Sequence, residues 1–176
     1  DFETLNAADL NALGNDGWIV YGNVFSGTTG DFLYGYGTFP APNNPAMPAF
    51  SNIVVGEGGP EQGLQQLSIF SDYENATAHV AGDLVNANFF KEFTIDASDV
   101  GKACTFQFSA KLGNLAAPST ALAFIKTLDP ANGYAETNFV SEDMSLLTTD
   151  WGGWTLNLTI DASLEGQLIQ FGFACD

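Results

Sequence analysis

The sequence has 176 residues, the length of one ordinary domain, and it is strongly acidic, with 21 Asp and Glu residues, four Lys and Arg residues and a formal net charge of -17. A nucleic-acid-binding protein needs cations to displace the counterions of phosphate, so the composition excludes that class of partner. It argues equally against an anionic membrane surface, and no apolar run is long enough to insert into a membrane. The acidity fits either solubility in salty water or calcium binding by some carboxylates.

Short segments rich in Phe, Val, Ile and Thr alternate with Gly, Pro, Asn and Asp, which is typical of an all-β protein. Only residues 7–13 have a helical pattern. So many strands around one core predict a two-sheet antiparallel jelly-roll β-sandwich, formed by residues 1–176 as a single domain. In chain order, the predicted strands are 2–5, 18–25, 32–39, 53–55, 66–73, 88–95, 104–111, 121–127, 137–142, 154–160 and 167–175.

Two stretches of the chain echo one another, TIDASDVGKACTFQFSA at 94–110 and TIDASLEGQLIQFGFAC at 159–175. In each, a strand ends at Thr-Ile-Asp-Ala-Ser, the chain turns through a glycine, and a Phe-x-Phe strand follows. We expect Asp96 and Asp161 to cap these turns by accepting hydrogen bonds from backbone N–H groups. Two similar corners in one sandwich explain the echo better than a repeated domain does.

The two cysteines fall in these echoed strands. Cys104 has the parity of Phe106, and Cys175 has the parity of Phe173, so both predicted strands turn their cysteine toward an apolar face. If the two strands lie antiparallel, the sulfur atoms can meet. We therefore expect a Cys104–Cys175 disulfide in an oxidising compartment, where it closes a long loop.

Catalytic groups are scarce, and the sequence indicates that the protein is not an enzyme. His79 is the one histidine, and no nucleophile elbow, zinc-protease motif or metal-type Cys/His spacing is present. A glycosidase built from two carboxylates is the alternative, because any two acids can meet in space. Its candidate acids are Glu57, Glu61, Glu136 and Glu142.

Several aromatic residues in or beside strands are candidates for carbohydrate binding, because flat rings stack on the apolar faces of sugars. Core packing is the alternative for each ring, and it is the stronger alternative for the two tryptophans inside strands. The candidates are Tyr34, Tyr36, Trp151, Trp18, Tyr21, Tyr134 and Trp154.

The chain begins at Asp1 with a strand-like segment, as a secreted protein does after removal of its signal, so we expect a secreted protein that is extracellular or on the cell surface. Asn75 and Asn157 fit the N-glycosylation pattern. Asp1, Glu3 and Asp176 lie at the two chain ends, which are often close in a sandwich, and they are the candidate ligands of a structural Ca²⁺ ion. Solvated terminal acids are the alternative.

The chain resembles the jelly-roll carbohydrate-binding modules that have a galactose-binding-domain-like fold. The resemblance covers nearly the whole length and rests on loose patterns: Phe2-Glu3, Gly17-Trp18, Gln66-Leu67-Ser68-Ile69-Phe70-Ser71-Asp72-Tyr73, the segment 106–111, and the Trp154 segment that leads into 166–173. The resemblance implies a non-catalytic sugar-binding role for the aromatic candidates and a calcium role for Glu3. It also implies one further closing strand, which is absent before the chain ends at Asp176.

Two functions follow from these observations. In the first, the chain is a structural subunit of an extracellular fibre, sheath or matrix that pairs with copies of itself through an open sheet edge, near 2–5 or 167–175. In the second, it is a soluble carbohydrate-binding module that binds polysaccharide. The first is the preferred hypothesis at this point and the second is the alternative.

Overall fold

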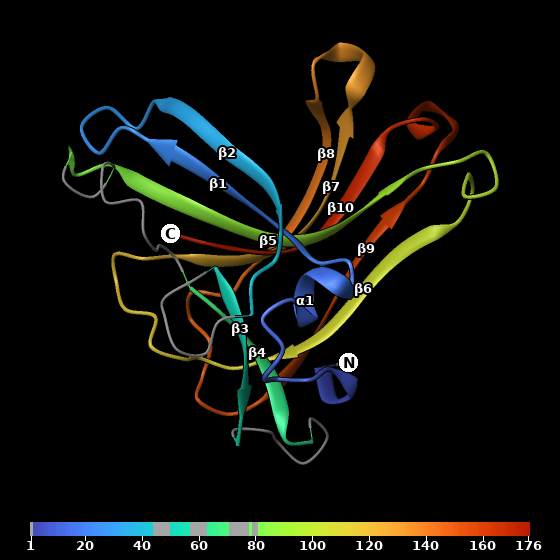
Figure 1. Cartoon of the computed structure of the whole chain (residues 1–176). Helices are drawn as coiled ribbons and strands as arrows, with labels where there is room; N and C mark the ends of the chain where they lie inside the picture. The colour runs from blue at the N-terminus through green and yellow to red at the C-terminus, as the bar shows by residue number, and fades with distance from the viewer. Residues whose placement is uncertain (1, 44–49, 57–62, 71–77, 79–80) are drawn as a thin grey trace.

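A computed structural model describes residues 2–43, 50–56, 63–70, 78 and 81–176. The described strands pair antiparallel throughout, in a six-stranded sheet of order β2-β1-β5-β10-β7-β8 and two small sheets, β3-β4 and β6-β9 (Figure 1). The all-β, sandwich-like class expected from the sequence is therefore confirmed. The strands are β1 Ile19–Phe25, β2 Phe32–Pro40, β3 Ser51–Val55, β4 Gln65–Ile69, β5 Leu84–Thr94, β6 Ala103–Ala110, β7 Ala121–Asp129, β8 Ala135–Asp143, β9 Gly152–Thr159 and β10 Leu168–Cys175.

The helical segments are short. They are η1 Phe2–Thr4, α1 Ala12–Asn15, η2 Pro130–Asn132 and η3 Ala162–Leu164, and none of the described helices is long and apolar enough to span a membrane. The expectation of a strand at 2–5 is wrong, because this segment forms the 3-10 turn η1. Its Phe2 ring instead packs on Trp18, with ring centroids 5.9 Å apart.

The core lies between one face of the six-stranded sheet and the smaller elements. At one end, Trp18 stacks on Phe89 with centroids 4.5 Å apart, beside Leu13 and Ile53 of α1 and β3. At the other end, the β6–β9 pair packs on β7 and β10 through a cluster that contains several aromatic rings. This second cluster contains Phe106, Phe108, Phe171, Phe173, Leu156, Ile125 and Ile169.

The predicted disulfide is wrong, and the direction of two strands explains why. The Phe106 ring contacts Phe171 and Phe173, at 5.2 and 5.3 Å between centroids, and Phe108 contacts Phe173 at 5.0 Å. The contacts advance the same way along β6 and β10, so these strands run in a similar direction rather than antiparallel. Cys104 and Cys175 consequently lie toward opposite ends of the contact, and both are free thiols.

The last strand is not a sheet edge. β10 is hydrogen-bonded to β5 on one side and to β7 on the other, over its whole length. The expected open edges at 2–5 and 167–175 are therefore wrong, because one is a 3-10 turn and the other is an interior strand. The expected gap for a closing strand is not confirmed. Self-association stays a prediction, but neither of the two segments expected to mediate it is an open sheet edge.

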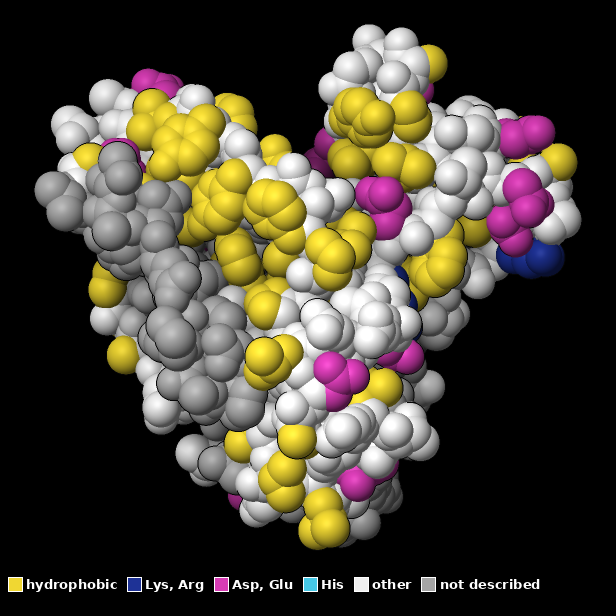
Figure 2. Space-filling view, viewed as in Figure 1, with side chains coloured by type: hydrophobic (Ala, Val, Ile, Leu, Met, Phe, Trp, Pro, Cys, Tyr) yellow, Lys and Arg dark blue, Asp and Glu magenta, His cyan; other side chains and the backbone are white. Residues whose placement is uncertain are grey.

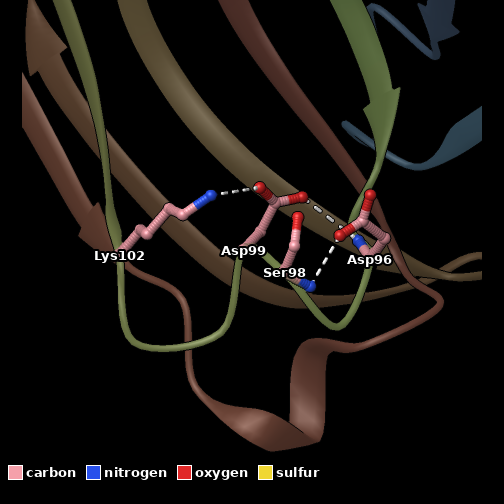
Figure 3. Close-up of polar contacts among 4 residues, drawn as sticks. All are labelled: Asp96, Ser98, Asp99 and Lys102. Carbon is pink, nitrogen blue, oxygen red and sulfur yellow. Dashed lines mark hydrogen bonds and ion pairs between the residues drawn. The ribbon is translucent and has the colours of Figure 1, made fainter.

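The expected turn caps are confirmed. The Asp96 carboxylate accepts a hydrogen bond from the Ser98 N–H at 2.7 Å, while Asp99 accepts from the Asp96 N–H and pairs with Lys102 at 3.4 Å (Figure 3). In the second copy of the echo, Asp161 accepts from the backbone N–H of Ser163 at 2.8 Å. These contacts fix two corners between strands and need only local sequence to form.

The two cysteines should titrate as thiols. Protein purified without reductant and then unfolded should react with two equivalents of a thiol reagent per chain. In the folded protein Cys175 should react slowly, because burial raises its pKa to about 12 and the thiolate is the reactive form. A Cys104→Ser variant should keep one equivalent. If the unfolded protein contained no reactive thiol, the Cys104–Cys175 disulfide expected from the sequence would be supported instead.

The Asp161 cap should make stability depend on pH in the acid range. Hydrogen bonds from the hydroxyl and N–H of Ser163 lower the pKa of Asp161 below 3.8, so the folded state favours the carboxylate. Its contribution to the free energy of unfolding should be complete above pH 3.8 and disappear as the pH falls through the lower, folded value. Asp161→Asn keeps an acceptor oxygen but carries no charge. At pH 6 its free energy of unfolding in urea should be lower than that of the parent protein, and in strong acid the difference should disappear.

The matched control is Asp150→Asn, an exposed position whose carboxylate accepts no hydrogen bond from the described residues. If both variants lowered the free energy of unfolding by the same amount at every pH, the role of the cap would be contradicted.

Candidate functional site

The face of the six-stranded sheet opposite the core is called the outer face here. Strand register fixes its members, because partners across a ladder point to the same side of a sheet. Tyr21 lies opposite Asn88, and Asn88 lies opposite Ala174. The outer face includes Ile19, Tyr21, Asn23, Asn86, Asn88, Phe90, Glu92, Gln170, Gly172, Ala174, Leu122, Phe124, Lys126 and Phe139.

A hydrophobic cluster lies at the middle of the outer face, with Phe90, Phe124 and Ala174 each at most 4% exposed. The hydrophobic side chains that pack against it belong to the same sheet, and they are Ile19, Tyr21, Leu122 and Phe139. The sheet itself must therefore curve around the cluster to exclude water. Figure 2 shows a hollow between the wing of β1 and β2 and the β7–β8 hairpin, with hydrophobic side chains on both walls.

Three asparagines form a polar network beside this cluster. Asn88 is 5% exposed, and its amide donates to the Asn86 side-chain oxygen at 2.8 Å and to the Asn86 carbonyl at 3.3 Å. Asn23 lies across the ladder from Asn86, with its amide nitrogen 3.5 Å from the same side-chain oxygen. An asparagine side chain carries two donors and an acceptor, so these contacts leave hydrogen-bonding capacity on the half-buried Asn23 and Asn86.

A second polar row crosses β5, β10 and β7. Gln170 lies between Glu92 and Lys126 in register, is 5% exposed, and donates from its amide to Glu92 at 2.6 Å. The Gln170 side-chain oxygen is buried and has no hydrogen-bond partner among the residues that the structure describes. A buried acceptor without a partner costs free energy, and this oxygen is too enclosed for a ligand to reach while the side chain keeps this position.

Lys126 is the cation of the outer face. Its ammonium lies 4.9 Å from the centre of the Phe124 ring and 6.0 Å from the centre of the Phe90 ring. Burial lowers the pKa of Lys126, while Glu136 and Glu92 act in the opposite direction. The ammonium group is thus held beside the aromatic rings, with donors that a ligand oxygen could engage.

Most of the aromatic residues expected to bind carbohydrate lie elsewhere. Trp18 is 8% exposed, stacks on Phe89, and donates from its ring nitrogen to Asp16 at 3.1 Å. Trp154 stacks on Phe108 in the core cluster, at 6.0 Å between centroids. Their positions favour the core-packing alternative for these two residues.

The remaining candidates are scattered. Tyr34 and Tyr36 lie on the core side of β2, Trp151 precedes β9 with Lys111 over its ring at 5.7 Å, and Tyr134 is 62% exposed between η2 and β8. Tyr21 is the only one of the seven on the outer face. The seven residues therefore do not form one site.

The expected calcium ligands are not brought together within the described chain. The Glu3 carboxylate accepts from the Gln65 N–H, whereas Asp176 accepts from the backbone and hydroxyl of Thr120. No three His, Cys, Asp or Glu residues in the described ranges lie close enough to share a metal ion. Asp1 lies outside these ranges, and the calcium site stays a prediction.

Other sequence candidates remain as predictions. Asn157 is exposed on β9, and its side chain accepts from the Thr105 hydroxyl at 2.8 Å. Of the candidate glycosidase acids, Glu136 and Glu142 lie on β8. His79, Asn75, Glu57 and Glu61 lie outside the described residues.

The sequence reasoning missed the polar members of the outer face. The signal was present in β5, where LVNANFFKEFT alternates Val85, Ala87 and Phe89 with two asparagines. Amides at alternating strand positions normally face water, which is why this pattern was not singled out. Their partner Gln170 is distant in sequence, and only strand order brings it beside them.

Comparisons with known proteins add little. No protein-family model matches the sequence, and no curated protein matches it significantly. A solved structure described as "CBM4 structure and function", from a carbohydrate-binding module family, matches 99% of this chain and 93% of its own, with 15% sequence identity and a TM-score of 0.42.

Gly172 should be essential to the curved centre of the outer face. It lies between Phe90 and Phe124 in register, and a Cβ atom there would stand 2.1 Å from the Phe89 carbonyl oxygen. Gly172→Ala should therefore lower the free energy of unfolding by about 1–3 kcal/mol, measured by urea denaturation. Gly153→Ala in β9 meets nothing within 4 Å and should change it by less than about 0.5 kcal/mol. Equal values for the two variants would contradict this packing.

Proposed function

We propose that this protein is a non-catalytic polysaccharide-binding module and that the outer face of the six-stranded sheet is its binding surface. The observation that supports this most is the asparagine network beside the aromatic cluster, where the half-buried Asn23 and Asn86 keep unused hydrogen-bonding groups. Concave surfaces that mix apolar rings with a few fixed polar groups are typical of ligand sites.

Sugars suit this surface chemically. Each hydroxyl group can both donate and accept, and the outer face presents an acceptor at Glu92 and donors at Lys126 and the asparagine amides. The rings of Tyr21 and Phe139 lie at the border of this polar set, and Phe139 is 47% exposed. They offer apolar faces against which a sugar ring can pack.

The charge of the protein favours a neutral ligand. At a net charge of -17, the protein repels a polyanion as it approaches. Lys126 attracts an anionic group locally, but Glu92 and Glu136 act on the same ammonium and offset that attraction. We therefore propose that the ligand is a neutral polysaccharide. Such polymers occur outside cells and on cell surfaces, and the proposed location of the protein is there.

The binding surface can be tested with the two half-buried asparagines. Asn23→Ala and Asn86→Ala should each weaken binding to a neutral polysaccharide about three- to tenfold, because each removes a side chain able to bond a sugar hydroxyl. Affinity electrophoresis against a panel of neutral and acidic polysaccharides provides the measurement, and urea unfolding confirms that the variants are folded.

Two kinds of control separate the outer face from other surfaces. Gln107→Ala changes an exposed amide on β6 and should bind as the parent does. Trp151→Ala removes a candidate ring that precedes β9, a strand outside the six-stranded sheet, and this variant should also bind normally. If Trp151→Ala weakened polysaccharide binding and the asparagine variants did not, the binding site would lie outside the outer face.

A further inference from the structure

Tyr134 holds a backbone conformation that side chains avoid. Its φ is 62°, and it is the only non-glycine residue with a positive φ in the described chain. In this left-handed region the Cβ atom crowds the neighbouring carbonyl oxygen, so glycine and asparagine are favoured there and a bulky residue is a rarity. The tyrosine therefore costs stability relative to a simpler residue at the same position.

The turn around Tyr134 is firmly built. The Asp129 carbonyl accepts the Tyr134 N–H at 2.8 Å, and the Asp129 carboxylate caps η2 by accepting from Ala131 at 2.9 Å. Pro130 begins η2 and Gly133 continues the turn with a φ of 65°. The backbone is fixed on both sides of Tyr134, so the position of its Cα–Cβ bond is set before any ligand arrives.

The ring contributes little to the fold. Tyr134 is 62% exposed, more than any other large aromatic residue among those described, and it stacks on no described ring. Neither burial nor packing compensates for the strained backbone. A strained backbone conformation that stabilises no packing contact is typical of residues that take part in binding.

The location supplies that role. Tyr134 lies at the tip of the hairpin formed by β7 and β8, which projects away from the rest of the sheet (Figure 1). The same two strands carry Lys126, Phe124 and Phe139 on the outer face. From Phe139 to Tyr134 is five residues, or roughly 17 Å along an extended strand. A single sugar could not touch both, but a polymer chain could.

We infer that Tyr134 is a distal contact for the polysaccharide, reached by a chain that extends from the outer face along the β7–β8 hairpin. This inference rests on the proposed function. The fixed turn presents the ring with little conformational freedom left to lose, which favours binding by a flat aromatic group. The ligand it implies is a long chain rather than a short oligosaccharide.

Tyr134→Asn tests this inference through two opposite effects. Asn tolerates the left-handed backbone, so the variant should unfold at a higher urea concentration than the parent. It should also bind the long polysaccharide about tenfold more weakly, while short oligosaccharides of the same polymer bind both proteins equally. Calorimetric titration with chains of graded length measures this.

Tyr134→Phe is the matched control, because it keeps both the ring and the strained backbone. It should match the parent in stability and retain most of the affinity for long chains. Parent protein that binds no polysaccharide at all would reject the proposed function, and this inference with it. Parent protein that binds, together with a Tyr134→Asn variant of undiminished affinity for long chains, would overturn the distal contact alone. An unchanged urea midpoint for Tyr134→Asn would overturn the strain argument.

Discussion

The position of β10 between β5 and β7 determines the rest of this structure. Its backbone groups are paired on both sides, which fixes three segments distant in sequence into one sheet. The alternation of its side chains then divides the molecule. Phe171 and Phe173 point to the core, whereas Gln170 and Ala174 point to the outer face. A slip of one residue in this strand would exchange the two sets, burying an amide in the aromatic core and exposing the phenylalanines.

Aromatic contacts make that register costly to change. Phe106 and Phe108 of β6 pack against Phe171 and Phe173, at right angles or tilted, with centroids about 5 Å apart. Each buried ring contributes stabilisation through the apolar area it removes from water, and the specific geometry adds to it. On the other side of the strand, Gly172 lets β5 approach closely and allows the Phe90 and Phe124 rings to meet at 6.4 Å. The same strand thus stabilises the core and shapes the outer face.

Local features of this fold could be predicted from the sequence, and non-local ones could not. Alternating apolar residues located most of the strands, and the Asp96 and Asp161 caps followed from their turns, because both depend on neighbouring residues alone. The placement of Cys104 relative to Cys175 depended on whether two distant strands run in the same direction, which alternation does not specify. Strand order also decided that 167–175 is interior. The amides of the outer face escaped notice for a related reason: Asn88 looks like a solvent-facing residue until Gln170 is placed on the neighbouring strand.

The distribution of positive charge bears on the same surface. The protein has four lysines and 21 acids, and two ion pairs between described residues join Lys91 to Asp16 at 3.0 Å and Lys102 to Asp99 at 3.4 Å. Lys126 instead extends over the outer-face rings, where burial penalises its charge. Glu136 and Glu92 offset part of this penalty, and further oxygen atoms that approached the ammonium would offset more of it. Hydroxyl oxygens of a neutral polymer would satisfy it without adding to the electrostatic repulsion of an acidic protein. The rings alone offer only a weak substitute for those oxygens, so the surroundings of Lys126 support the proposed binding role of the outer face.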